Sequence, residues 1–270
     1  MPRTAKPIWK PLWRLAGAAF ACSLGVCVAT STKAADPKPT IVLVHGAFAD
    51  SSSWNGVVAD LTRDGYPVVA VANPLRSLAG DAAYVASVVK SVKGPVVLVG
   101  HSYAGAVVSV AADGLPNVKS LVFVDAFEPE TGETSLGLTG RFPGSTLGPT
   151  LAPPVDLPGG GRDLYVLQDR FPAQFAADLP LAEARVMAAE QRPVTQAALA
   201  EAASAAAWKT IPSWTIYGTA DVNIPPATLV FMAERAHARE TVAVPGASHM
   251  VMLSHPAAVA RLIEDAAKGE

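Results

Sequence analysis

One serine stands where a β-branched apolar run meets a turn of small residues. The motif at 100–105 reads Gly-His-Ser-Tyr-Ala-Gly, and the alanine- and valine-rich stretch 106–112 that follows predicts a helix. A strand, a tight turn and a helix in this order hold a serine in a strained backbone conformation, with its hydroxyl above the sheet. Gly100 and Ala104 are small enough to let the strand and the helix pack closely. The pattern predicts that Ser102 is a nucleophile.

A serine hydroxyl reacts poorly at neutral pH unless a base takes its proton and a third group orients that base. The functional groups of an open α/β sheet gather on the loops after its strands. Among the five histidines, His249 lies in such a loop, directly after the apolar run 240–244. We expect His45 to make structural hydrogen bonds in a tight turn, and the side chain of His101 to point elsewhere. His249 is therefore the predicted general base.

Two aspartates are candidates for the group that orients the base. Asp221 follows the predicted strand 213–217 and precedes a short loop and a helix that starts with proline. Asp125 ends the predicted strand 120–125, so both carboxylates face the same edge of the sheet as Ser102. We favour Asp221 because its loop should lie closer to the base. Asp125 stays open as the alternative, or as a hydrogen-bonding group beside the segment that follows it.

An acyl-transfer site also needs two N–H donors for the negative charge that develops on the substrate oxygen. The backbone of Tyr103, directly after the serine, is the first expected donor. The second should come from the loop after the first strand, at Ala47 or Phe48. We prefer Ala47, because it directly follows the His-Gly pair at 45–46.

The rest of the chain supplies the scaffold for these loops. Continuous apolar runs of strand length indicate a parallel sheet that is buried on both faces. Their alternation with helical stretches predicts right-handed crossovers and a doubly wound sheet. The predicted strands lie at 40–44, 67–71, 96–99, 120–125, 213–217 and 240–244.

The alternation breaks between residues 128 and 208. The stretch 128–161 is rich in Gly, Pro, Thr and Leu without a clear period, which is unusual for a compact domain and typical of a lid. Helices are predicted at 171–178, 180–190 and 195–207. We interpret 128–208 as an inserted cap; the alternative is a peripheral helical decoration with no role in substrate binding.

Composition narrows the classes of protein. The 270 residues are 50% hydrophobic and 16% charged, enough for a sizeable core. The net charge of −2 and the lack of a basic block argue against a nucleic-acid partner. Both cysteines fall before residue 28, so the chain after residue 34 has no disulfide and no cysteine-based metal site.

The first 34 residues predict a secretory signal peptide. Four basic residues at positions 3, 6, 10 and 14 precede an apolar stretch at 15–30, and small residues surround Ala34. The apolar stretch is shorter than the roughly 20 residues that a membrane span needs. We therefore predict a periplasmic or secreted domain at 35–270 without stable membrane association. An uncleaved anchor is the alternative.

Four features together resemble the α/β-hydrolase superfamily. They are the Val-His-Gly-Ala-Phe stretch at 44–48, the serine motif, Asp221 and the Ser-His pair at 248–249. The resemblance is to its small bacterial serine esterase-like branch, which is related to plant methylesterases and hydroxynitrile lyases. It implies the α/β-hydrolase fold, a mostly parallel doubly wound sheet with an inserted helical cap. It also implies Ser102 as nucleophile, His249 as base and Asp221 as acid, with no cofactor and no metal. Ala104, where the motif has Gly, is a small departure.

The expected function is a secreted serine hydrolase that cleaves small carboxylic esters through an acyl-enzyme. Four aromatic residues are predicted to line an apolar pocket for its small-molecule substrate, namely Phe48, Trp54, Phe171 and Phe175. The same fold permits other functions. The alternatives are a cofactor-free lyase or perhydrolase, and a non-catalytic ligand-binding relative. The sequence carries no signal for an oligomeric state.

Overall fold

A parallel sheet forms the centre of the computed structural model, which describes residues 37–270. The predicted signal peptide at 1–34 lies outside the described residues. In the described part of the chain, six strands pair in the spatial order β2-β1-β3-β4-β8-β9, and every pairing is parallel. The strands are β1 Thr40–Val44, β2 Val68–Val71, β3 Val96–His101, β4 Val118–Val124, β8 Ser213–Gly218 and β9 Glu240–Val244. The predicted doubly wound sheet is confirmed.

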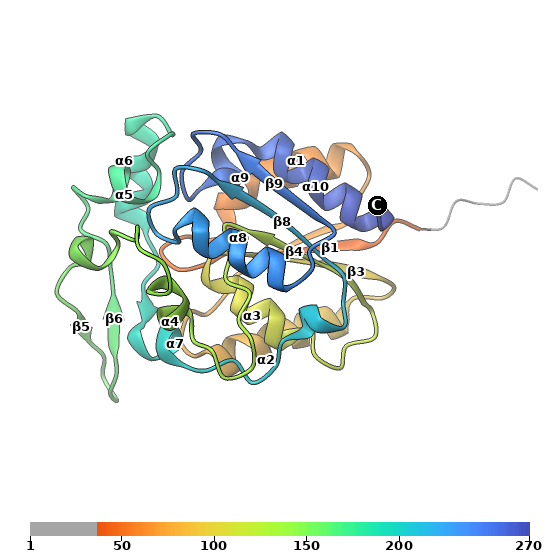
Figure 1. Ribbon diagram of the computed structural model, residues 1–270, viewed down its shortest axis with the longest axis horizontal. Helices are drawn as coiled ribbons and strands as arrows, with labels where there is room; N and C mark the ends of the chain where they lie inside the picture. The colour runs from red at the N-terminus through yellow and green to blue at the C-terminus, as the bar shows by residue number, and fades with distance from the viewer. Residues whose placement is uncertain (1–36) are drawn as a thin grey trace, which may run out of the picture. The chain divides into compact units, whose positions relative to one another are not determined.

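Burial explains why the central strands read as continuous apolar runs. β1, β3 and β8 are buried along almost their whole length, whereas the edge strands β2 and β9 each have only one fully buried position, at their last residue. Helices cover both faces of the sheet (Figure 1). One face carries α1 Asn55–Arg63 and α10 Pro256–Lys268, and the other carries α2 Leu78–Ser91, α3 Tyr103–Ala111 and α8 Pro226–Arg235. Two short helices, η1 Ser51–Trp54 and α9 Val251–Ser254, complete this part.

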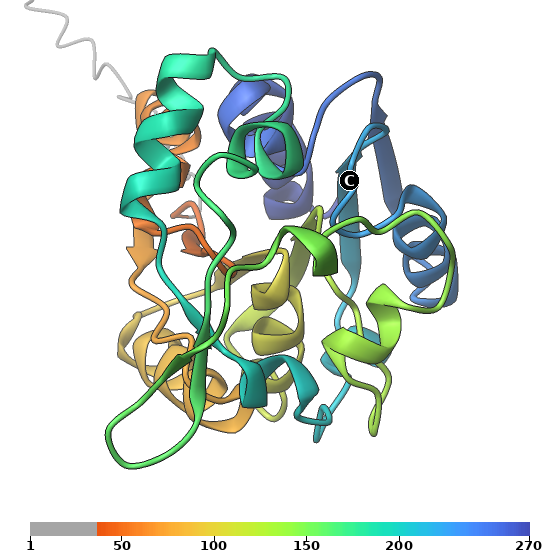
Figure 2. The ribbon, with the colours of Figure 1, turned by 90° about the vertical axis from the view of Figure 1, so that its left-hand side faces the viewer.

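The chain between β4 and β8 leaves the sheet, and we call residues 128–208 the cap. Figure 2 shows its elements from the side on which they lie. They are α4 Ser135–Thr139, η2 Gly148–Thr150, β5 Val155–Asp156, β6 Arg162–Leu164, α5 Phe171–Phe175, α6 Leu181–Glu190, β7 Val194–Thr195, α7 Gln196–Ala200 and η3 Ala207–Lys209.

The cap differs in detail from the sequence expectation. The helix expected at 180–190 is α6, but the other two expected helices shorten to α5 and α7. The stretch 128–161, expected to have no regular structure, contains α4 and contributes β5 to a small antiparallel sheet, β5-β6-β7. Strands of two or three residues are too short to leave an alternating pattern in the sequence.

Polar contacts join the cap to the central domain. Arg76, just before α2, pairs with Asp163 of the cap at 2.7 Å. The carboxylate of Glu201 accepts hydrogen bonds from the backbone N–H groups of Leu78, at 2.6 Å, and Ala79, at 3.2 Å. These N–H groups belong to the first turn of α2 and have no partner within the helix. A carboxylate from the cap therefore completes the start of a helix in the central domain.

A buried acid lies where the cap begins. Glu128 is fully buried, and its carboxyl accepts a hydrogen bond from the Thr215 hydroxyl at 2.9 Å. Burial raises the pKa of Glu128 to about 8, although the Thr215 hydrogen bond and the Arg235 charge oppose the change. The side chain is therefore mostly uncharged at neutral pH.

None of the helices within residues 37–270 is long and apolar enough to cross a membrane.

We predict that Glu128→Gln stabilises the protein at high pH. The native pKa of about 8 exceeds the ordinary value of 4.5, so the native state holds a proton that the unfolded chain releases. This contribution to stability is complete below pH 4.5 and is lost as the pH rises through 8. The variant carries an amide that never ionises, so its gain in Tm over the wild type should be larger at pH 9 than at pH 5.

Thermal unfolding at the two pH values measures this difference. Glu240→Gln, at an exposed position of β9, is the matched control and should change Tm equally at both. An equal effect of Glu128→Gln at pH 5 and pH 9 would contradict the prediction.

Candidate active site

The three side chains singled out by the sequence meet in one chain of hydrogen bonds. Ser102 lies between β3 and α3, Asp221 follows β8, and His249 follows β9. The Nε2 atom of His249 is 2.9 Å from the Ser102 hydroxyl oxygen, and its Nδ1 atom is 2.6 Å from a carboxylate oxygen of Asp221. All three residues are buried. The imidazole can therefore take a proton from the serine while the carboxylate holds the ring.

The turn around Ser102 depends on close approach of the backbone. Ser102 has φ +54° and ψ −125°, a conformation that is unfavourable for a residue with a side chain. A Cβ atom at Gly100 would lie 2.6 Å from the carbonyl oxygen of Ala104. One at Gly46 would lie 2.5 Å from the carbonyl oxygen of His101 and 2.7 Å from the Ser102 Cβ. The loop after β1 is thus packed directly against the serine turn.

The Asp221 carboxylate is held on both sides. One oxygen contacts His249, and the other accepts hydrogen bonds from the backbone N–H groups of Asn223, at 2.7 Å, and Ile224, at 3.1 Å. These contacts fix the direction of the carboxylate. The sequence did not lead to Asn223 as a residue of this site. Its position two residues after the acid, where an Asx-type turn closes, was the available signal.

Asp125 occupies a different position. One of its carboxyl oxygens accepts a hydrogen bond from the N–H of Gly218 at 2.7 Å, which joins the end of β4 to the end of β8. Burial, and next the nearby charge of Asp221, raise the pKa of Asp125 well above its ordinary value. The geometry thus makes Asp221 the partner of the imidazole, and Asp125 a hydrogen-bonded link between two strands.

His45 has the structural hydrogen bonds expected for it. Its Nε2 atom accepts from the backbone N–H of Asn73 at 3.0 Å, and its Nδ1 atom lies 3.0 Å from the carbonyl oxygen of Gly46. Because a carbonyl only accepts, Nδ1 carries the proton. Burial lowers the pKa of His45 to about 4, so the ring is neutral and ties the loop after β1 to the loop after β2.

The expectation that the His101 side chain points away from the site is wrong. Its Nε2–H donates to the carbonyl oxygen of His249 at 3.1 Å, and the two rings lie 4.8 Å apart. Burial, followed by the charge of His249, lowers the pKa of His101 well below its ordinary value. The neutral ring supports the loop that carries His249.

The two candidate N–H donors after β1 have different partners. Phe48 donates its backbone N–H to the carbonyl oxygen of Arg192 in the cap at 3.1 Å. Within residues 37–270, the backbone N–H groups of Ala47 and Tyr103 donate no hydrogen bond to a backbone carbonyl outside the helices and strands. Both of these residues line the same cavity as Ser102. The geometry therefore favours Ala47 over Phe48 as the second donor.

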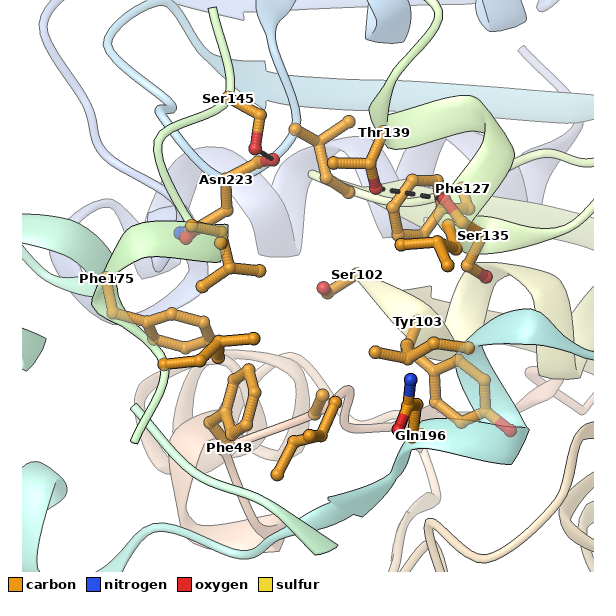
Figure 3. A pocket seen from close by; sticks show the side chains of 18 of the residues that line it. Phe48, Ser102, Tyr103, Phe127, Ser135, Thr139, Ser145, Phe175, Gln196 and Asn223 are labelled. Carbon is orange, nitrogen blue, oxygen red and sulfur yellow. Dashed lines mark hydrogen bonds between the residues drawn. The ribbon is translucent and has the colours of Figure 1, made fainter. Parts of the chain in front are cut away.

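A cavity of about 420 Å³ opens above the serine, between the central domain and the cap. In Figure 3 the Ser102 hydroxyl faces its middle, with Phe48 and Phe175 on one side and Tyr103 on the other. Much of the remaining wall is apolar. Phe127 precedes the cap, and the cap contributes Leu136, Leu147, Leu151, Leu164 and Leu199. Arg162 and Gln196 are exposed polar residues of the lining.

Two of the four predicted lining residues are absent from the cavity wall. Phe48 and Phe175 line it, with their rings 5.8 Å apart, and Phe175 also packs on His249 at 4.9 Å. Trp54 is fully buried with its ring 6.4 Å from that of His101, and Phe171 is fully buried with its ring 5.0 Å from that of Phe175. An aromatic residue type does not reveal which layer of packing the ring occupies.

Comparison with known proteins identifies the family. Residues 41–262 match the model of the alpha/beta hydrolase family. This match spans most of the chain, and the sheet and the serine turn fit it. The protein belongs to the α/β-hydrolase family.

Within residues 37–270, no group of three or more His, Cys, Asp or Glu side chains is arranged to hold a metal ion.

Individual relatives are distant. A carbendazim hydrolyzing esterase of Nocardioides sp. is 33% identical over 110 residues, 36% of this chain and 46% of that esterase, so the match spans just under half of its length. Alpha/beta hydrolase nvfD of Aspergillus novofumigatus is 26% identical over 250 residues, 85% of this chain and 97% of the relative. The solved structure of polyneuridine aldehyde esterase superimposes with a TM-score of 0.73 at 20% identity, covering 84% and 98% of the two chains.

We predict that Gly46→Ala slows the reaction of Ser102 with a fluorophosphonate by at least about tenfold. The added Cβ would overlap the serine turn, so the Ala47 N–H or the Ser102 hydroxyl must move. Gly140→Ala is the control, because the nearest atom to its Cβ would be the carbonyl oxygen of Gly137 at 3.8 Å. Labelling followed by mass spectrometry measures both rates; a wild-type rate for Gly46→Ala would show that this packing does not control the site.

Proposed function

We propose that this protein is an exported serine hydrolase that cleaves small carboxylic esters through Ser102, His249 and Asp221. The observation that carries the proposal is the position of the His249 imidazole, within hydrogen-bond distance of both the serine and the carboxylate. Export rests on the signal-peptide pattern at 1–34. The esterase names of the Nocardioides relative and of the superimposed structure support the reaction class.

The geometry supports a two-step mechanism. As the Ser102 oxygen attacks the ester carbonyl carbon, His249 takes the hydroxyl proton through Nε2. The carbonyl π electrons move to the carbonyl oxygen, where the N–H groups of Ala47 and Tyr103 donate hydrogen bonds. The tetrahedral intermediate then expels the alcohol, which receives the proton from His249 and leaves an acyl-enzyme. Asp221 stabilises the imidazolium that exists between the two transfers.

Water completes the cycle. His249 removes a proton from a water molecule that attacks the acyl carbon, and the proton returns to the Ser102 oxygen as the acid leaves. Phe175 covers one side of the imidazole, which limits its contact with solvent. The products are one acid and one alcohol for each ester.

The cavity supports an apolar substrate. Aromatic and aliphatic side chains form most of its wall, and among the described residues that line it Arg162 is the one Arg, Lys, Asp or Glu. A wall of this kind favours an ester with an apolar acyl or alcohol part. The volume of about 420 Å³ lies within the range of roughly 300–1,000 Å³ typical of small-molecule sites.

We predict that Ser102→Ala lowers the turnover of p-nitrophenyl acetate by at least about 10³-fold, because the step that forms the acyl-enzyme is lost. The Tm should stay close to the wild-type value, since only one small polar atom is removed. Release of p-nitrophenolate is followed by absorbance, and circular dichroism checks the fold. Full turnover by the variant would refute the role of Ser102.

Product analysis separates hydrolysis from the other reactions that the fold permits. With a hydrolase, acid and alcohol appear in equal amounts. A lyase would release a carbonyl compound instead, and a perhydrolase would need peroxide to form a peracid. Tight binding of a metabolite with no turnover would favour the ligand-binding alternative.

We also predict that kcat/KM rises from p-nitrophenyl acetate to the butyrate and hexanoate. Each additional CH₂ that enters the apolar cavity contributes up to about 0.8 kcal/mol, or roughly fourfold. A panel of esters of increasing chain length, assayed on one preparation, measures the trend. A preference for acetate over all longer esters would contradict an apolar acyl site.

A further inference from the structure

We propose that Gln174, in α5 of the cap, is a positioning residue for Asp221. It lies outside the reacting chain of Ser102, His249 and Asp221, and it acts through the loop that carries the carboxylate. The inference rests on the proposed function, because that chain must operate as a unit for its alignment to affect the rate.

Gln174 uses its whole side-chain amide at the boundary between the cap and the central domain. It is 5% exposed. Its Nε2 atom donates to the side-chain oxygen of Asn223 at 2.9 Å and to the carbonyl oxygen of Val222 at 3.2 Å. Its Oε1 atom accepts from the hydroxyl of Thr146 at 2.9 Å. The backbone carbonyl of Gln174 also accepts from the side-chain amide of Asn223 at 3.1 Å.

These contacts reach the acid through one intervening residue, Asn223. The backbone N–H of Asn223 donates to Asp221 at 2.7 Å, and the other carboxylate oxygen contacts His249. Gln174 therefore forms hydrogen bonds with the side chain of Asn223 and with the backbone next to it, and Asn223 in turn orients the carboxylate. Three links join the cap to the base: Gln174 to Asn223, Asn223 to Asp221, and Asp221 to His249.

The residues around Gln174 contact the base loop as well. The ring of Phe175 packs on His249 at 4.9 Å. The hydroxyl of Ser248, directly before the base, donates to the carboxylate of Asp178. The segment 174–178 thus touches the loops of both the acid and the base. Gln174 differs from its neighbours because its hydrogen bonds lead to the carboxylate.

An apolar side chain would fill the space that Gln174 occupies, but it could not make these hydrogen bonds, which need an amide. A buried amide is costly unless its hydrogen bonds are made. Here each one goes to the acid loop or to Thr146, which borders it. The geometry therefore points to orientation of the acid loop as the role of this side chain.

The test compares two glutamines of the cap. Gln174→Met keeps the side-chain length and removes the hydrogen bonds to the acid loop. Gln191→Met removes three side-chain hydrogen bonds to Val166 and Ala188, all within the cap, and is the matched control. We expect kcat for p-nitrophenyl butyrate to fall about tenfold or more in Gln174→Met, because misaligned catalytic groups lose rate.

The expected pattern separates positioning from stability. KM of Gln174→Met should stay within about twofold of the wild type, because the apolar walls that bind substrate are unchanged. Gln191→Met should lower Tm by a similar amount with kcat within about twofold. A wild-type kcat for a folded Gln174→Met, or an equal loss of kcat in both variants, would overturn the proposal.

Gln174→Glu is the second variant, in case the methionine variant does not fold. It keeps the shape and the Oε1 acceptor for Thr146 but loses both donors to the acid loop. We expect the same loss of kcat. Wild-type kcat in this variant would overturn the proposal.

Proton NMR gives a readout that does not need turnover. The Nδ1–H of His249, hydrogen-bonded to Asp221, should give a far-downfield resonance that disappears in His249→Ala. We expect it in the wild type and in Gln191→Met, and expect it shifted or broadened in Gln174→Met. If the wild type shows no ester turnover, the proposed function fails while this resonance still tests Gln174. An unchanged resonance in Gln174→Met would overturn the positioning role.

Discussion

The site depends on the backbone conformation of Ser102. A positive φ at a residue with a side chain costs on the order of 1–3 kcal/mol and persists only where the surrounding packing enforces it. Here Gly46 and Gly100 allow backbone to approach from two sides. This packing fixes the Ser102 hydroxyl oxygen 2.9 Å from the Nε2 atom of His249 and places Tyr103 at the wall of the cavity. Strand pairing, the small-residue turn and the loop after β1 all serve this geometry.

Three acids near the ends of β4 and β8 show how the surroundings assign roles to one chemical group. Asp221 receives two backbone N–H donors and the imidazole. Asp125 receives one backbone donor, and Glu128 receives one hydroxyl. Burial raises the pKa of both Asp125 and Glu128, so their carboxyls stay protonated at pH values where an exposed carboxyl is ionised. Their different hydrogen-bond partners give the three acids different roles. Asp221 contacts the base, whereas Asp125 and Glu128 link elements of the scaffold.

The sequence predicted the central sheet because its strands are long apolar runs, and it led to Ser102, Asp221 and His249 because parallel strands bring their following loops to one edge. It could not place Trp54 or Phe171, since burial in the core and lining of a cavity require the same residue types. The short strands β5 to β7 left no periodic signal. Gln174 gave none either, because its partners lie 28 to 49 residues away along the chain.

The carboxylate that Glu201 places on the first turn of α2 has a consequence for evolution and engineering. Exchanging the cap for that of a relative would leave the amides of Leu78 and Ala79 uncapped, unless the donor segment carries an acid at the same point. Arg76 would likewise lose Asp163. Chimeras that respect only the boundaries of the insertion would therefore have two N–H groups without their acceptor at the start of α2, where Ser77 accepts only from the N–H of Gly80. Grafting should move the cap together with the segment that leads into α2.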